Sequence, residues 1–386
     1  MKRQTRTTAA PLAAIAALGG VLAVMPACQS SSKSSTQAPR QPSTESTQSA
    51  ESGQTIPTAP VVVKNYSDRV VMSDLRERAI GVIETAARSP SAEVRANAVE
   101  ASMKMPARAE PLLAAALKDE SPAVRTVAAM AVGRLKDRDL VSSVRPLVDD
   151  PSGYCRAAAI YALTMCGDQI DPSPLASMLL SDPSTKVRAH AASILGMIGN
   201  PTALPLLKQA AHDGAPRATQ VDEKLLQLQI AEAMVRLGDY QAINAVYSGL
   251  YPGRAEELEA SALAAQILGE LRDRASIDRL IYVAEYRNPQ GQRYSAEVRL
   301  AAATALARIG IVRGGFIADE FWASTIPALR SQAAFAYGEI GTPESLAHLE
   351  VMLGDTDPRV RVSAAHGVLN IIDTLGGTRT HNVRSR

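Results

Sequence analysis

The histidines are the side chains of this sequence most able to bind a metal or move a proton, and they stand far apart. No two have His-Glu-x-x-His spacing, and none pairs with a cysteine at zinc-finger spacing. The chain also lacks a Gly-Lys-Ser/Thr phosphate loop, a Gly-x-Ser-x-Gly elbow and a dinucleotide fingerprint. We therefore expect a non-enzymatic protein with no catalytic residue, no metal site and no cofactor. The histidines are His190, His212, His348, His366 and His381.

Arginine and aspartate recur at fixed places along the chain and could form a ladder that binds anions. The recurrent arginines are Arg95, Arg125, Arg156, Arg188, Arg299, Arg330 and Arg361. The aspartates that precede such positions are Asp119, Asp150, Asp182, and Asp355 or Asp357. A residue that recurs once per unit usually serves the unit itself. We therefore expect each Asp to cap a helix and each Arg to pair with the Asp of a neighbouring unit.

Three segments, 246–260, 282–299 and 314–322, depart from this regularity and carry aromatic and arginine side chains. Tyr, Trp and Arg are enriched at protein interfaces, and insertions in repeat proteins usually map to one functional face. Two interpretations stand: a partner-binding surface, or rings that fill gaps between poorly matched repeats. The candidate partner-binding residues are Tyr247, Tyr251, Arg254, Tyr286, Arg293, Tyr294 and Trp322.

The segment 182–200, DPSTKVRAHAASILGMIGN, shows which element positions these residues. Asp182 is predicted to be the helix N-cap, with Pro183 at the first helical position. Apolar residues then recur every three or four positions between 187 and 198, which predicts one buried helical face. Gly199 is expected to end the helix. A second, shorter helix should follow, so that each unit is an antiparallel pair.

The unit recurs about every 31 residues, in seven clear copies and two degenerate ones around Leu226 and Ala260. Its pattern, Asp-x₄-Val-Arg-x₂-Ala-Ala-x₂-Leu-Gly, resembles the HEAT-like repeats named for phycobilisome lyases. The resemblance covers residues 67–376 and implies an all-α fold, an α-solenoid of about nine HEAT-like helical hairpins. We expect neighbouring pairs to bury one another's apolar faces in an elongated, monomeric superhelix. The family includes lyase subunits, scaffolds and adaptors, so the resemblance leaves the function open.

The N-terminus carries the features of an export signal. Residues 1–27 combine a basic start with an apolar stretch that ends in small residues. The sequence LAVMPAC resembles a bacterial lipobox, which implies a diacylglycerol on Cys28, although Met25 and Pro26 depart from the pattern. Simple secretion and a retained N-terminal anchor are the alternatives. Residues 28–66 are rich in Ser, Thr, Gln and Pro and are predicted to be a flexible linker, and residues 377–386 a disordered tail.

Charge and cysteine content narrow the choice of partners. Residues 67–376 contain 32 basic and 37 acidic side chains, a balance of −5 that argues against nucleic-acid binding. Cys155 and Cys166 stand eleven positions apart in one predicted helix, too far for a disulfide, so we expect two buried thiols.

We therefore predict an exported scaffold or adaptor that binds an unknown protein partner at the cell envelope, in the periplasm or held at a membrane by a lipid on Cys28. One alternative is a chromophore-attachment factor or other lyase-related factor, like the phycobilisome lyases. Those act beside pigments in the cytosol, whereas this chain carries an export signal. A nucleic-acid-binding rod is the other alternative.

Overall fold

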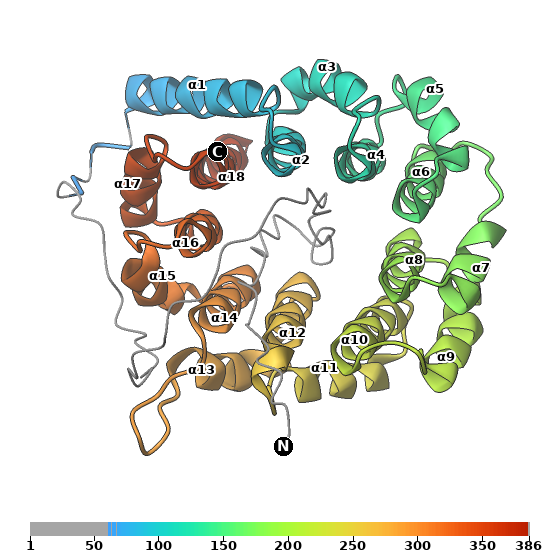
Figure 1. Cartoon of the computed structure of the whole chain (residues 1–386). Helices are drawn as coiled ribbons and strands as arrows, with labels where there is room; N and C mark the ends of the chain where they lie inside the picture. The colour runs from blue at the N-terminus through green and yellow to red at the C-terminus, as the bar shows by residue number, and fades with distance from the viewer. Residues whose placement is uncertain (1–60, 63, 67, 385–386) are drawn as a thin grey trace, which may run out of the picture.

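The computed structural model describes residues 61–384 except 63 and 67. The predicted signal peptide, Cys28 and nearly all of the predicted linker lie outside these residues. In the described part the secondary structure is helical and no β-strand forms, although Arg287 and Arg293 make an isolated β-bridge. The helices alternate between an outer and an inner layer (Figure 1). The predicted all-α solenoid is therefore confirmed.

The outer layer consists of the odd-numbered helices: α1 (Arg69–Ala86), α3 (Pro106–Ala116), α5 (Val141–Val144), α7 (Ser173–Ser181), α9 (Leu204–Asp213), α11 (Ile243–Gly249), α13 (Ile277–Glu285), α15 (Gly315–Phe321) and α17 (Pro343–Met352). The inner layer consists of the even-numbered helices: α2 (Ala92–Ala101), α4 (Pro122–Leu135), α6 (Gly153–Met165), α8 (Thr185–Ile198), α10 (Gln220–Arg236), α12 (Leu258–Glu270), α14 (Ala296–Ile309), α16 (Pro327–Ile340) and α18 (Pro358–Arg384). The inner helices carry the Val-Arg segments, and each packs against the next.

The predicted elongated spiral is corrected, because the two ends of the helix array meet. α18 packs against α1 and α2, and the helices form a ring (Figure 1). Apolar side chains from α1 and from α18, such as Ile83 and Leu369, belong to one buried cluster. The terminal pairs thus bury the faces that an open rod would leave exposed to water, which the hydrophobic effect favours.

Hydrogen bonds also join the two ends of the helix array where the ring closes. Glu350 of α17 accepts hydrogen bonds from the Lys64 ammonium at 2.6 Å, the Arg78 guanidinium at 2.8 Å and the Tyr66 hydroxyl at 3.2 Å. Lys64 and Tyr66 belong to the segment expected to be a linker, and Tyr66 is buried against the array. At the other end, α18 extends past residue 376 into the segment expected to be a tail.

Close contact between inner helices explains the recurrent Leu-Gly of the pattern. A Cβ added to Gly196 of α8 would lie 2.6 Å from the Ala233 Cα of α10. A Cβ added to Gly269 of α12 would lie 2.8 Å from the Ala305 Cα of α14. A heavier side chain has no room at either position, so glycine sets how closely neighbouring units approach.

The predicted start of α8 is displaced by two residues. Its N-cap is Ser184 rather than Asp182, and the helix begins at Thr185, so Pro183 lies outside it. The Asp182 carboxylate instead accepts a hydrogen bond from the Ser184 backbone N–H at 2.8 Å and closes a turn before the helix. Gly199 ends the helix in the left-handed region, with φ of 77°, as the sequence indicates.

Both cysteines lie at α6 as free, buried thiols, which confirms their predicted state. Of the helices in the described residues, none is long and apolar enough to cross a membrane.

Candidate functional site

The recurrent arginines fasten one unit to the next. Arg95 grips Asp119 with two hydrogen bonds of 2.7 and 2.8 Å, and Arg125 grips Asp150 at 2.9 and 3.1 Å. Arg330 and Asp355 repeat the arrangement at 2.7 and 2.8 Å. These pairs confirm the predicted pairing of Arg with a neighbouring Asp. The predicted capping by Asp is wrong, because Ser121 and Ser152 hold the N-cap positions of α4 and α6.

Each aspartate of such a pair also organises its own junction. The Asp119 carboxylate accepts the Ser121 backbone N–H at 2.8 Å, two residues further along. Burial acts to raise the pKa of Asp119, but the hydrogen bonds from Arg95 and Ser121 outweigh it and hold the pKa below its usual range. The carboxylate is therefore charged in the folded protein and joins a turn to the neighbouring inner helix.

The other four recurrent arginines use other partners. In the described residues, Arg156 and Arg361 donate to backbone carbonyls, such as those of Asp150 and Asp355. Arg188 donates to the backbone carbonyls of Leu179 and Gly214, each at 2.8 Å, and to no carboxylate among the described residues. Arg299 donates to Glu320 of α15 at 2.8 and 3.0 Å. The arginine keeps its place in the repeat, while the groups that accept its hydrogen bonds differ from unit to unit.

Three of the predicted partner-binding residues lie together in a cluster on the outer layer. Tyr251, Tyr286 and Tyr294 surround Tyr282, which the sequence analysis left out of its candidates. Ring centroids lie 4.6 Å apart for Tyr282 and Tyr286, 6.1 Å for Tyr251 and Tyr282, and 6.1 Å for Tyr286 and Tyr294. We call these four residues the tyrosine cluster. Tyr251 is 40% exposed and Tyr282 44% exposed, so aromatic surface remains open to solvent.

The other four candidates contact residues outside the cluster. The Tyr247 hydroxyl donates to Asp273 at 2.8 Å, and Trp322 packs edge-on against His348 with ring centroids 4.9 Å apart. Both rings lie against the hydrophobic core, where they fill space between repeats. Arg254 donates to Gln220 at 2.7 Å.

Arg293, the remaining candidate, anchors the inserted connection that carries Tyr294. Its guanidinium donates to both oxygens of Glu320, at 2.7 and 2.8 Å. Glu320 also receives Arg299, so one carboxylate joins the inserted 286–295 connection to an inner helix. The insertion is thus fixed to the repeat framework and holds Tyr294 in place.

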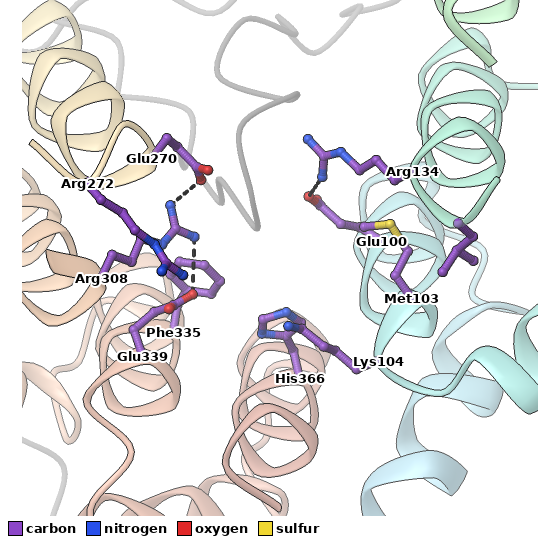
Figure 2. A pocket seen from close by; sticks show the side chains of 12 residues that line it. Glu100, Met103, Lys104, Arg134, Glu270, Arg272, Arg308, Phe335, Glu339 and His366 are labelled. Atoms are coloured by element: carbon purple, nitrogen blue, oxygen red, sulfur yellow. Dashed lines mark hydrogen bonds and ion pairs between the residues drawn. The ribbon is translucent and has the colours of Figure 1, made fainter. Parts of the chain in front are cut away.

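A cavity of about 370 Å³ lies on the inner side of the ring and was not predicted (Figure 2). It is lined by Glu100, Met103, Lys104, Arg134, Leu135, Gly269, Glu270, Arg272, Arg308, Phe335, Glu339 and His366. We call it the inner cavity. Its walls come from the first two units and from the last four, which face one another across it.

Four of the charged residues that line the inner cavity share one position in the repeat. Lys104, Arg134, Arg308 and Glu339 each stand ten residues after the apolar member of a Val-Arg or Leu-Arg pair. This position lies in the last turn of α4, α14 and α16 and just after the end of α2, so the four side chains gather at the same end of the inner helices. The repeat register therefore contained a signal for this site, which a search for motifs local in sequence could not detect.

Ion pairs cross part of the inner cavity. Arg308 joins Glu270 of α12 and Glu339 of α16, the latter at 3.1 Å (Figure 2). The Glu100 Oε1 atom lies 3.7 Å from the Arg134 Nη1 atom, and neither oxygen of Glu100 accepts a hydrogen bond within the described residues. Burial raises the pKa of Glu100 to about 8, although Arg134 and Arg308 act to lower it.

His366 faces Glu100 from α18 and is likewise buried. Burial, together with the positive charges of Lys104 and Arg308, lowers the pKa of His366 to about 3, and its Nδ1 atom has no hydrogen-bond partner in the described chain. In residues 61–384, the two undescribed positions aside, no three His, Cys, Asp or Glu side chains are grouped to hold a metal ion.

Comparison with known families agrees with the architecture. A family model described as HEAT repeats matches residues 80–164, 149–221 and 172–251. Residues 80–251 are thus similar to HEAT repeats, in agreement with the α-solenoid described above. Among proteins of curated function, no match was found.

Three solved structures are among those similar to this chain. The complex of CpcE and CpcF of phycocyanin lyase from Nostoc sp. PCC7120 matches with 20% identity and a TM-score of 0.37, covering 68% of this chain and 99% of that one. Human deoxyhypusine hydroxylase in complex with glycerol matches with 20% identity and a TM-score of 0.34, covering 62% and 89%. An engineered protein matches with 16% identity and a TM-score of 0.31, covering 80% and 96%. No function is transferred from these likenesses.

Proposed function

We propose that this protein is a non-enzymatic scaffold that holds a protein partner against the tyrosine cluster. The observation that carries the proposal is the meeting of two insertions, after α11 and after α13, in one exposed group of stacked rings. Aromatic rings that pack on each other lose little conformational entropy on binding and supply large contact area, the properties of interface anchors. A helical solenoid offers a broad surface around such an anchor.

The support of the cluster favours the same role. Arg293 and Arg299 converge on Glu320, so the connection that carries Tyr294 is fastened at its base. A surface that is rigid before binding costs less to order when the partner arrives. The exposed rings therefore form a prepared surface, unlike Tyr247 and Trp322, which lie against the core.

The test places a photo-crosslinking amino acid at residue 282 of the full chain in its native cells. Tyr240, which is 74% exposed on the outer side but lies outside the cluster, provides the matched control position. We expect a partner protein to be trapped from position 282 and not from position 240. The Tyr251→Ala/Tyr282→Ala variant should weaken recovery of that partner about tenfold or more. Equal trapping at both positions would disprove the proposal.

Two further measurements separate this role from the two alternatives. A chromophore-attachment factor would carry a visible absorbance band of a bound tetrapyrrole after purification. A nucleic-acid-binding rod would hold duplex DNA with an affinity that falls steeply between low and high salt. We expect neither property.

We further propose that the scaffold is exported and tethered through a lipid on Cys28. The basic start, apolar stretch and lipobox-like segment support this, and the 28–66 segment provides a polar spacer of suitable composition. Cys28→Ser should move the protein from the membrane fraction to the soluble envelope fraction. Cys166→Ser, a change at a buried thiol, serves as the control that should leave fractionation unaltered. An unchanged distribution for Cys28→Ser would reject the lipid tether while leaving the partner surface untouched.

A further inference from the structure

The inner cavity is completed only when the ring closes. Glu100 and Lys104 come from the first unit, and His366 comes from the last inner helix. The Lys104 ammonium donates to the Asn370 amide oxygen of α18 at 2.7 Å, where the ring closes. The cavity therefore joins the two ends of the repeat array.

Its cationic side chains are only partly neutralised. Arg308 is shared by Glu270 and Glu339. Lys104 has a neutral amide as its hydrogen-bond partner, and the Arg272 guanidinium makes no hydrogen bond or ion pair within the described residues. Two positive charges, from Lys104 and Arg272, are thus available to a ligand in the same cavity.

Two buried polar groups point into this space and lack the partners that buried groups need. Glu100 is 3% exposed and has two oxygens without a hydrogen-bond donor, while His366 is 8% exposed and has an unpartnered Nδ1 atom. Figure 2 shows Glu100 of α2 and His366 of α18 beside the open centre of the cavity, on two helices that pack against each other. Unsatisfied buried polar atoms cost free energy unless a water, an ion or a ligand supplies the missing bond.

We infer that the inner cavity binds a small anion with two oxyanion groups, carboxylate or phosphate, which pair with Lys104 and Arg272. The Glu100 carboxyl group and His366 face the oxyanions and supply hydrogen bonds. Phe335 and Met103 offer apolar contacts for the body of the ligand. The inference concerns a different surface from the partner-binding cluster and does not depend on it.

The protonation state of Glu100 is consistent with the binding of an anion. The groups that face Glu100 are Arg134 from α4, Glu270 from α12, Arg308 from α14 and His366 from α18, with Lys104 one helical turn further along its own chain. Their combined field is positive, yet burial keeps the Glu100 carboxyl protonated at neutral pH. A protonated carboxyl group donates a hydrogen bond to an oxyanion, whereas an ionised one repels it.

The experiment measures binding to the full chain by isothermal titration calorimetry. Citrate and pyrophosphate are the two anionic probes, so that the carboxylate and phosphate sources are tested separately, and spermidine tests a cationic ligand. We expect one of the anions to bind and spermidine not to bind. Arg272→Gln and Lys104→Gln should each weaken anion binding about tenfold. Arg274→Gln, at an exposed arginine two positions from Arg272 and outside the cavity, is the control and should bind as the parent does.

The pH dependence provides a second readout. Affinity should be about tenfold higher at about pH 6 than at about pH 9, because Glu100 ionises between them. Glu100→Gln should remove that dependence. Anion binding that is indifferent to both Arg272→Gln and Lys104→Gln, no binding of either anion at millimolar concentration, or preferential binding of spermidine would each overturn the inference. Thermal unfolding of every variant verifies that the ring is intact.

Discussion

The early and late parts of the ring use the same helix packing, and Arg330 of the late part keeps the pairing with the aspartate of the next junction. Arg299 of the late part differs from Arg330 in its acidic partner. In the early part, Arg95 and Arg125 each grip the aspartate of the next junction. In the late part, Arg299 instead reaches Glu320 on an outer helix, and Arg293 of an insertion joins the same carboxylate. The comparison shows that the acidic partner of the recurrent arginine can change while the repeat is kept. The change occurs beside the insertion that carries part of the tyrosine cluster.

The contact between inner helices is the feature that both parts share, and its disruption should have the largest effect. Gly196→Val in the early part and Gly269→Val in the late part should each lower the free energy of unfolding by about 3 kcal/mol. Both Cβ positions collide with backbone of the next inner helix. Urea denaturation measures the loss. Gly81→Val, where an added Cβ meets nothing within 4 Å, should cost far less. A large difference between the two core variants would break the claim of common packing.

Removal of an Arg–Asp ion pair in the early part should have the next largest effect on stability. Arg125→Met leaves the Asp150 carboxylate buried without its guanidinium, so the free energy of unfolding should fall by about 2–3 kcal/mol. Arg188→Met removes only two bonds to carbonyls and should cost about 1–2 kcal/mol. Chemical denaturation of both variants compares them directly. Replacing Asp150 by Leu in the Arg125→Met background should recover part of the loss, and an absence of recovery would contradict the pairing.

A third prediction concerns Glu100, a residue of the early part whose carboxyl group faces side chains of the late part. The pKa of Glu100 is raised by burial to about 8 from its ordinary value of 4.5, so its protonated form is the one that the fold favours. Its contribution is fully present below about pH 4.5 and is lost as pH rises through about 8. Glu100→Gln should therefore stabilise the protein by about 2 kcal/mol at about pH 9 and change little at about pH 4.5. Thermal unfolding across this range tests the prediction, with the exposed Glu110→Gln as control. Equal effects at both pH values would show that Glu100 is ionised when buried.

The smallest effect on stability is expected for the ion pairs that Glu320 makes in the late part. Glu320→Gln removes the charge that holds Arg293 and Arg299, and solvent screens part of this loss, so the cost should be about 1 kcal/mol. Hydrogen exchange should become faster in residues 286–295, because the insertion loses its anchor. Asp119→Asn should leave exchange in that segment unchanged. Similar exchange in Glu320→Gln and the parent would mean that the tyrosine cluster is positioned by ring stacking alone.

Local sequence predicted the parts of the fold that local physics controls. The helical period, Gly199 as a stop signal and the pairing of Arg with a neighbouring Asp are all present in the structure. The N-cap of α8 was predicted two residues too early, because the Asp182 carboxylate closes a turn with Ser184 instead of capping the helix. Both residue types serve either role, and the distinction depends on backbone geometry that a pattern of side chains does not contain.

The candidate surface was predicted in part. The sequence singled out Tyr251, Tyr286 and Tyr294 through their insertions, yet Tyr282 at the centre was passed over and Trp322 proved to lie against the core. Insertions reveal that a segment departs from the repeat. They do not reveal which of its rings turn toward solvent.

The sequence by itself determined the repeating unit, because a helix start, an apolar stripe and a glycine stop act within some thirty residues. Tertiary structure alone decided that nine units complete a ring and place Glu100 opposite Arg308. Curvature is a small rotation between adjacent pairs, and its sum over the whole array cannot be read from any one pair. Contacts across the ring therefore depend on every unit between them.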